Sequence, residues 1–124
     1  MNVDDTLTLK RFPVILETDC KNIDRVYPLK QKQISEIAKR AGLFPIVRKI
    51  TVFGSSVTAK CNIDSDLDLC IEADMSDGLK IFEMQKAFGE ACDWKIDIVM
   101  YSDIGKALRE TVLREGVVIY EQPA

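Results

Sequence analysis

Three aspartates are spaced as metal-binding carboxylates would be. Asp66 and Asp68 lie two residues apart in the apolar stretch DLDLCIE, and Asp97 lies between two isoleucines in WKIDIVMY. Residues two apart in a strand share a face, so Asp66 and Asp68 are predicted to lie side by side. Two carboxylates about 4 Å apart repel by about 1 kcal/mol in water, and by about 4 kcal/mol in a less polar setting. Mg²⁺, a hard cation that binds one or two carboxylates together with substrate phosphates, would resolve this repulsion.

Gly54 and Ser55 add groups that could contact a phosphate. They follow the β-branched stretch IVRKITVF, which predicts a strand ending at Gly54. A glycine lets the backbone approach a ligand closely, the serine offers a hydroxyl and an amide N–H, and a helical turn after them would point free N–H groups at an anion. Lys60, in the loop that follows, is the nearby cation.

With Asp97 as the third carboxylate, the set allows two metal ions, and Asp97 is placed to act as base or second-metal ligand. The three carboxylates are expected to converge and to face the Gly54–Ser55 loop.

Composition narrows the chemistry further. The chain has 124 residues, no histidine and a formal charge of −3. The absence of histidine excludes catalysis by a Ser-His or Cys-His pair. The negative net charge argues against a protein that coats nucleic acid, because such proteins carry a basic surface. The four cysteines form no CxxC pair, which argues against zinc and favours reduced thiols. No apolar run approaches membrane-spanning length and the N-terminus is acidic, so a cytoplasmic protein is predicted.

The elements that must position these residues can be read from local patterns. Helices are predicted over 29–42, 79–92 and between Ser102 and Gly116, and strands over 46–53, 66–72 and 94–101, with 117–120 as a short strand or a docking tail. This order predicts an α+β, two-layer fold, a small mixed β-sheet with helices on one face. Residues 1–28 are expected to form an N-terminal extension whose structure the sequence leaves open, and residues 29–124 the domain.

Gly54-Ser55, then Ser65-Asp66-Leu67-Asp68, then Asp97 on a later strand together resemble the signature of the DNA polymerase β-type nucleotidyltransferase superfamily. The size and layout over about residues 30–121 are similar to its minimal nucleotidyltransferases, the MNT proteins. The resemblance implies the nucleotidyltransferase fold and Mg²⁺-dependent transfer of AMP from ATP to a hydroxyl acceptor. It implies that Gly54, Ser55 and Lys60 bind nucleotide, that Asp66 and Asp68 bind both metals, and that Asp97 binds the catalytic one. One departure is that Ala59 and Lys60 stand where many members have a glycine and arginines.

The sequence does not identify the molecule that accepts AMP. Other enzymes of this superfamily bind the acceptor with a second domain, and no such domain is recognised in these 124 residues. A partner, a second copy of the chain or the N-terminal extension must supply the acceptor site. The resemblance to MNT proteins implies a HEPN toxin as partner, with this chain as its antitoxin. Two alternatives are a small-molecule, antibiotic-type nucleotidyltransferase and a catalytically weak module that neutralises a partner by contact.

Overall fold

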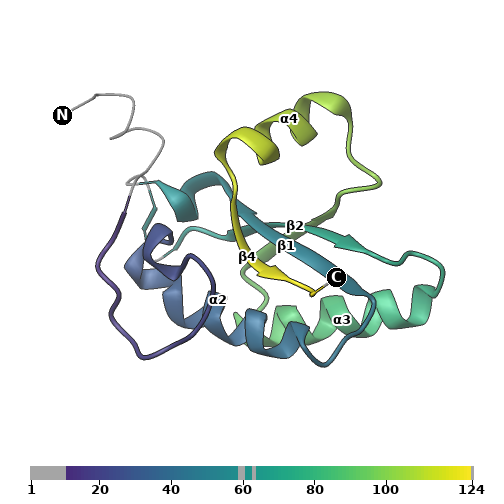
Figure 1. Cartoon of the computed structure of the whole chain (residues 1–124), viewed down its shortest axis with the longest axis horizontal. Helices are drawn as coiled ribbons and strands as arrows, with labels where there is room; N and C mark the ends of the chain where they lie inside the picture. Colours follow the sequence, from purple (N-terminus) through teal and green to yellow (C-terminus); the bar gives the residue numbers. More distant parts are fainter. Residues whose placement is uncertain (1–10, 59–60, 63, 124) are drawn as a thin grey trace.

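The computed structural model describes residues 11–58, 61–62 and 64–123 and has four strands and three α-helices (Figure 1). In chain order the elements are η1 (Ile23–Arg25), α2 (Pro28–Ala41), β1 (Val47–Phe53), η2 (Gly54–Val57), β2 (Leu67–Ala73), α3 (Gly78–Ala91), β3 (Ile96–Met100), α4 (Lys106–Glu115) and β4 (Val117–Glu121), where η marks a 3₁₀ helix. The C-terminal apolar segment is therefore a strand. None of the helices within the described ranges is long and apolar enough to cross a membrane.

The four strands form one mixed sheet in the order β3-β2-β1-β4. The central strand β1 runs antiparallel to both β2 and β4, whereas β2 and β3 are parallel. The parallel pair is joined through α3, because strands that run the same way need a long crossover connection. The predicted α+β fold with a small mixed sheet is confirmed.

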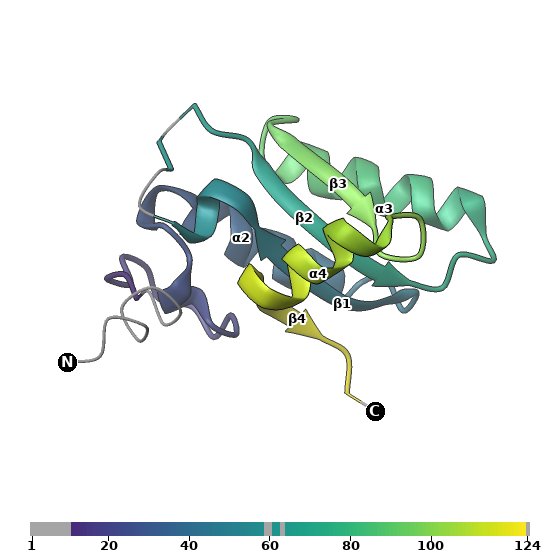
Figure 2. The ribbon, with the colours of Figure 1, turned by 90° about the horizontal axis from the view of Figure 1, so that it is seen from above.

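The helices cover both faces of the sheet, which corrects the expectation that they lie on one. Helices α2 and α3 pack under the sheet in Figure 1, and α4 lies above it, crossing β1 in the view of Figure 2. Thr51 of β1 and Cys70 of β2 are register partners on the α4 side, and both are buried. Val112 of α4 is 2% exposed. The alternation of strand side chains puts these residues on the second face, and α4 removes them from water.

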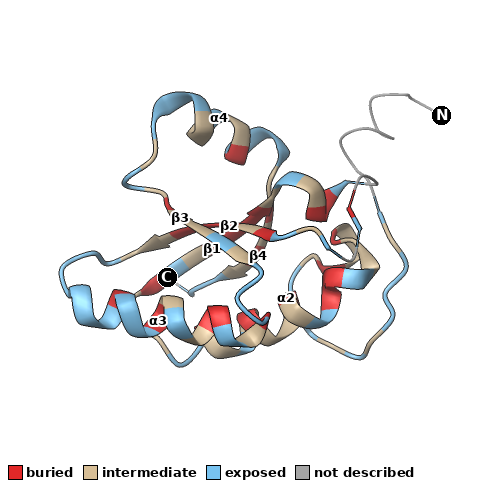
Figure 3. Ribbon diagram, turned by 180° about the vertical axis from the view of Figure 1, so that it is seen from behind, coloured by how far each residue is buried: buried red, intermediate tan, exposed pale blue. Residues whose placement is uncertain are grey.

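The main hydrophobic core lies between the sheet and the pair α2–α3. Leu67, Leu69 and Ile71 alternate along β2 and are at most 1% exposed. Ile34 of α2 and Phe88 of α3 are fully buried in the same cluster. Figure 3 shows the buried residues gathered on the sheet and on the helix faces turned toward it. Apolar burial on this side fixes which face of β2 points inward, and so sends Asp68 to the opposite face.

Helix boundaries follow local signals except in α4. Pro28 begins α2, where its missing N–H costs nothing. The Asp77 carboxylate caps α3 by accepting from the backbone N–H groups of Leu79 and Lys80. The last helix is expected to start directly after Ser102, a residue type that often caps helices. Instead, α4 begins only at Lys106, and its N-cap residue, Gly105, has no side chain to cap it.

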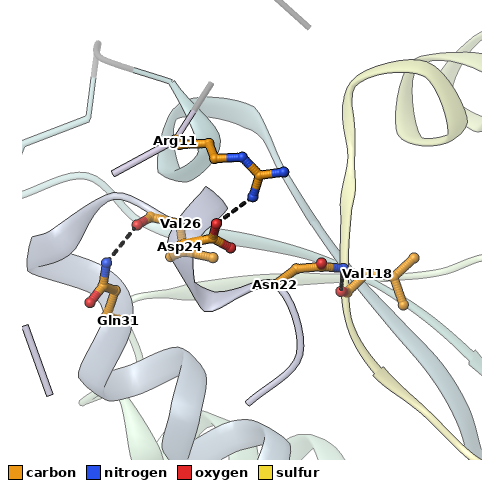
Figure 4. Close-up of polar contacts among 6 residues, drawn as sticks. All are labelled: Arg11, Asn22, Asp24, Val26, Gln31 and Val118. Atoms are coloured by element: carbon orange, nitrogen blue, oxygen red, sulfur yellow. Dashed lines mark hydrogen bonds and ion pairs between the residues drawn. The ribbon is translucent and has the colours of Figure 1, made fainter. Parts of the chain in front are cut away.

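The segment before α2 is anchored by hydrogen bonds to the rest of the chain (Figure 4). The Asn22 amide donates to the Val118 carbonyl of β4 at 2.8 Å. The Gln31 amide of α2 donates to the Val26 carbonyl at 3.1 Å, and Arg11 pairs with Asp24. Val26 itself is fully buried in the main core. The division of the chain at residue 28 stays a prediction.

Candidate active site

Asp68 and Asp97 lie directly opposite each other in the parallel pair of β2 and β3. Residues in register on neighbouring strands point to the same face, so both side chains lie on the face of the sheet that carries α4. Asp68 is half-buried and Asp97 is exposed. Two carboxylates from strands far apart in the sequence therefore meet at one place on an open part of the sheet.

Asp66 lies one residue before β2 begins and is exposed. Burial raises the pKa of the Asp68 carboxyl above its ordinary value, and the negative charges of Asp97 and then Asp66 raise it further. Asp97 and Asp66 are thus both close enough to Asp68 for their charges to act on its carboxyl. Like charges held together in this way disfavour ionisation unless a cation offsets them.

Gly54 is packed against the Asp68 carboxylate. β1 ends at Phe53, the register partner of Asp68, and the chain then enters the 3₁₀ turn η2. Gly54 has φ of 75°, a left-handed conformation that favours glycine. A Cβ atom at this position would overlap the Asp68 Oδ2. The absence of a side chain at Gly54 is therefore what lets the turn lie directly beside the carboxylate.

The serines of η2 have different surroundings. Ser55 is half-buried, and its carbonyl accepts from the backbone N–H of Thr58 at 3.0 Å. Ser56 is fully buried, and its carbonyl accepts from the Tyr27 backbone N–H at 2.8 Å. Lys60, predicted to bind nucleotide, lies outside the described residues.

The donor atoms at this site suit Mg²⁺. They are carboxylate oxygens on rigid strands, and Mg²⁺ is usually held by one or two carboxylates, waters and substrate phosphates rather than by an all-protein cage. Within the ranges the structure describes, no three His, Cys, Asp or Glu side chains are close enough to form such a cage. Asp68 and Asp97 share a face, the described residues contain no closed cluster of three carboxylates, and the convergence of all three acids on a metal stays a prediction.

Sequence reasoning missed one residue beside the site. Lys30, in the first turn of α2, is only 3% exposed, and its Nζ donates to the Ser65 carbonyl at 2.5 Å. Ser65 directly precedes Asp66. The signal in the sequence was spacing, because Lys30 lies four residues before Ile34 and seven before Ile37, in line with the buried stripe of the helix.

Comparison with known proteins shows the family to which the chain belongs. The family described as Polymerase beta, Nucleotidyltransferase matches residues 32–124, which is most of the chain. A protein of Thermococcus cleftensis named protein adenylyltransferase MntA is 33% identical over 85 residues, covering 68% of this chain and 82% of that protein.

Solved structures give the same fold. A protein assigned as a minimal nucleotidyltransferase has a TM-score of 0.57 at 28% identity, covering 68% of this chain and 87% of that one. A crystal structure of the toxin–antitoxin pair MntA-HepT has a TM-score of 0.55 at 22% identity, covering 74% of this chain and 73% of that one. The chain therefore belongs to the polymerase beta nucleotidyltransferase family, as the Gly-Ser turn and the three aspartates predicted.

Proposed function

We propose that this chain is an Mg²⁺-dependent nucleotidyltransferase that moves AMP from ATP to a hydroxyl group on a partner protein, a HEPN toxin, and so acts as its antitoxin in the cytoplasm. The observation that carries the chemistry is the register of Asp68 with Asp97 beside the Gly54 turn. It brings two carboxylates from neighbouring strands next to a glycine turn, which supports a site for a metal ion and a triphosphate.

Each residue has a role in the proposed step. The acceptor oxygen attacks the α-phosphorus, the bond from that phosphorus to the bridging oxygen breaks, and pyrophosphate leaves. Asp97, exposed at the edge strand, takes the acceptor's proton or shares in metal binding. Asp66 and Asp68 bind the metal, while Gly54 and Ser55 contact the triphosphate, with Lys60 as a further nucleotide ligand. Bound Mg²⁺ supplies charge stabilisation for the phosphoryl oxygens and the leaving group.

The acceptor is proposed from the relatives. The 33% identical relative is named a protein adenylyltransferase, so its acceptor is a protein. Solved structures of the same fold contain a HepT toxin partner, an ATP analogue (AMP-PNP), or a tri-AMPylated HEPN toxin from Shewanella oneidensis. A HEPN toxin encoded beside this chain is the acceptor we propose.

Label transfer tests this function. The chain is incubated with Mg²⁺ and ATP labelled at the α-phosphate, alone and with the neighbouring HEPN protein. The control is the Asp66→Ala plus Asp68→Ala double variant. We expect label on the HEPN protein with the natural chain and none with the control. In a separate incubation, a hydroxyl-bearing small molecule replaces the HEPN protein, and label on that molecule would indicate the antibiotic-type alternative. Absence of label with intact binding of the partner would overturn the enzymatic proposal and leave a binding module.

A further inference from the structure

The start of α2 contacts both loops of the candidate site. The backbone N–H of Tyr27, the residue before α2, donates to the Ser56 carbonyl of η2 at 2.8 Å. One turn later, the Lys30 ammonium donates to the Ser65 carbonyl at 2.5 Å. The first loop carries Gly54 and Ser55, and the second leads into Asp66. A single helix start therefore joins the proposed triphosphate loop to the proposed metal-binding loop.

The loop before Asp66 is a turn with its own internal hydrogen bonds. The Ser65 N–H donates to the Asn62 carbonyl at 3.1 Å, and the Asn62 N–H donates to the Ser65 Oγ at 3.1 Å. The Asp64 N–H donates to the Asn62 Oδ1 at 2.9 Å. These bonds shape the turn, yet they do not fix it to the body of the domain. The Lys30 bond connects its last carbonyl to α2, immediately before the first predicted metal ligand.

A lysine in this environment is costly unless its charge is hydrogen-bonded. Lys30 is 3% exposed and lies on the buried stripe of α2, whereas Lys32 on the same helix is exposed. Withdrawing an ammonium from water carries a large desolvation cost, and a methionine of similar length would fill the same space without it. The ammonium makes a charge-assisted bond to the Ser65 carbonyl, which a methionine could not make.

We propose that Lys30 is a positioning residue that holds the Ser65–Asp66 peptide so that the Asp66 carboxylate joins Asp68 in binding a divalent cation. The inference rests on the proposed function, because it assumes that these carboxylates bind metal. Lys30 touches neither metal nor nucleotide in this role. Lys30 would orient a metal ligand through a hydrogen bond, as residues just outside a metal site commonly do. Removing such a residue typically weakens metal affinity or activity by about 10–100-fold.

The test compares Lys30→Met with Lys32→Met, an exposed lysine two residues away on the same helix. Binding of Mn²⁺, a spectroscopic substitute for Mg²⁺, is measured on the full chain with α,β-methylene ATP, which cannot react. We expect Lys30→Met to weaken Mn²⁺ binding at least about tenfold. Its melting temperature in EDTA should stay close to that of the unmodified chain, because losing the buried ammonium removes its desolvation cost and the half-buried Ser65 carbonyl can bond to water instead. Lys32→Met should match the unmodified chain in both measurements.

Unchanged Mn²⁺ affinity in folded Lys30→Met would overturn the proposal. If that variant does not fold, Lys30→Gln replaces it, because glutamine keeps a polar tip while lacking both the charge and the reach to Ser65. Unchanged affinity in folded Lys30→Gln would overturn the proposal equally. The assay contains no acceptor, so a failure of AMP transfer to a HEPN protein would count against the proposed function and leave this result standing.

Discussion

Asp68 and Asp97 are register partners on parallel strands, and the Asp68 carboxylate also lies against Gly54. One carboxylate is thereby crowded by a second acid on one side and by the backbone of a turn on the other. The arrangement is unfavourable for an ionised Asp68 in the metal-free protein. In the proposed function a bound cation would offset this cost, so function and metal-free stability would be opposed at this residue.

Asp68→Asn should make the metal-free protein more stable at neutral pH. Burial and the charges of Asp97 and Asp66 raise the Asp68 pKa on folding, so ionisation of Asp68 destabilises the fold as pH rises through that raised pKa. Below the ordinary value of 3.8 the carboxyl is protonated in both states and this cost is absent. Melting temperatures in EDTA from pH 3.5 to 8 should show a gain for the variant at pH 7 that shrinks as the solution is acidified.

Two comparisons make that result specific. Asp103→Asn changes an exposed carboxyl elsewhere on the surface and should leave the melting curve nearly unchanged. Mg²⁺ with an ATP analogue should stabilise the unmodified chain and not Asp68→Asn, because the variant lacks the Asp68 carboxylate that is proposed to bind the metal with Asp66. A pH-independent difference between the Asp68 variant and the unmodified chain would contradict the electrostatic explanation.

Gly54→Ala should lower stability and abolish AMP transfer. The left-handed conformation at φ 75° costs a residue with a Cβ about 1–2 kcal/mol, and that Cβ would also overlap the Asp68 carboxylate. Urea unfolding and the label-transfer assay measure the two effects. Gly78→Ala is the matched control, since a Cβ there meets nothing within 4 Å. A Gly54→Ala protein with full activity would show that the turn does not need to lie so close to Asp68.

Gly89→Ala should displace the single tryptophan of the chain with little change in stability. A Cβ at Gly89 of α3 would overlap the ring of Trp94, which is 62% exposed and can move outward. Alanine favours the helix by about 1 kcal/mol over glycine, which offsets the lost packing. We expect a red shift of the tryptophan emission, with no shift in Glu90→Ala, an exposed position on the same helix. Unchanged emission in Gly89→Ala would place the ring elsewhere in solution.

The cysteines should react slowly with alkylating reagents in the native state. All four are free thiols, as predicted from their spacing. Burial raises the pKa of Cys20, Cys70 and Cys92 to about 11, so very little thiolate is present at pH 8. Mass spectrometry after iodoacetamide treatment should show slow modification of these three in the folded protein and rapid modification in urea. Fast native labelling of Cys70 would mean that the sheet face under α4 opens readily.

Much of the fold was readable because its signals are local. Alternation in DLDLCIE assigns Leu67 and Leu69 to the core and Asp68 to the opposite face without any knowledge of the neighbouring strands. Pro28 and the Asp77 cap mark helix starts through backbone chemistry within one turn. The start of α4 was misjudged because Ser102 is a good capping residue whose side chain makes no cap there, and the loop continues to Gly105.

The sequence by itself determined which residues are candidates for the chemistry and which face of its own strand Asp68 occupies, because strand periodicity and turn preferences act over a few residues. Only the tertiary structure decided that Asp97 stands opposite Asp68, that α4 covers the same face, and that Lys30 reaches the carbonyl before Asp66. Those relationships depend on strand order, register and helix packing. Strand order, register and helix packing are determined by the burial of apolar side chains from the whole chain, so no short stretch of residues specifies them.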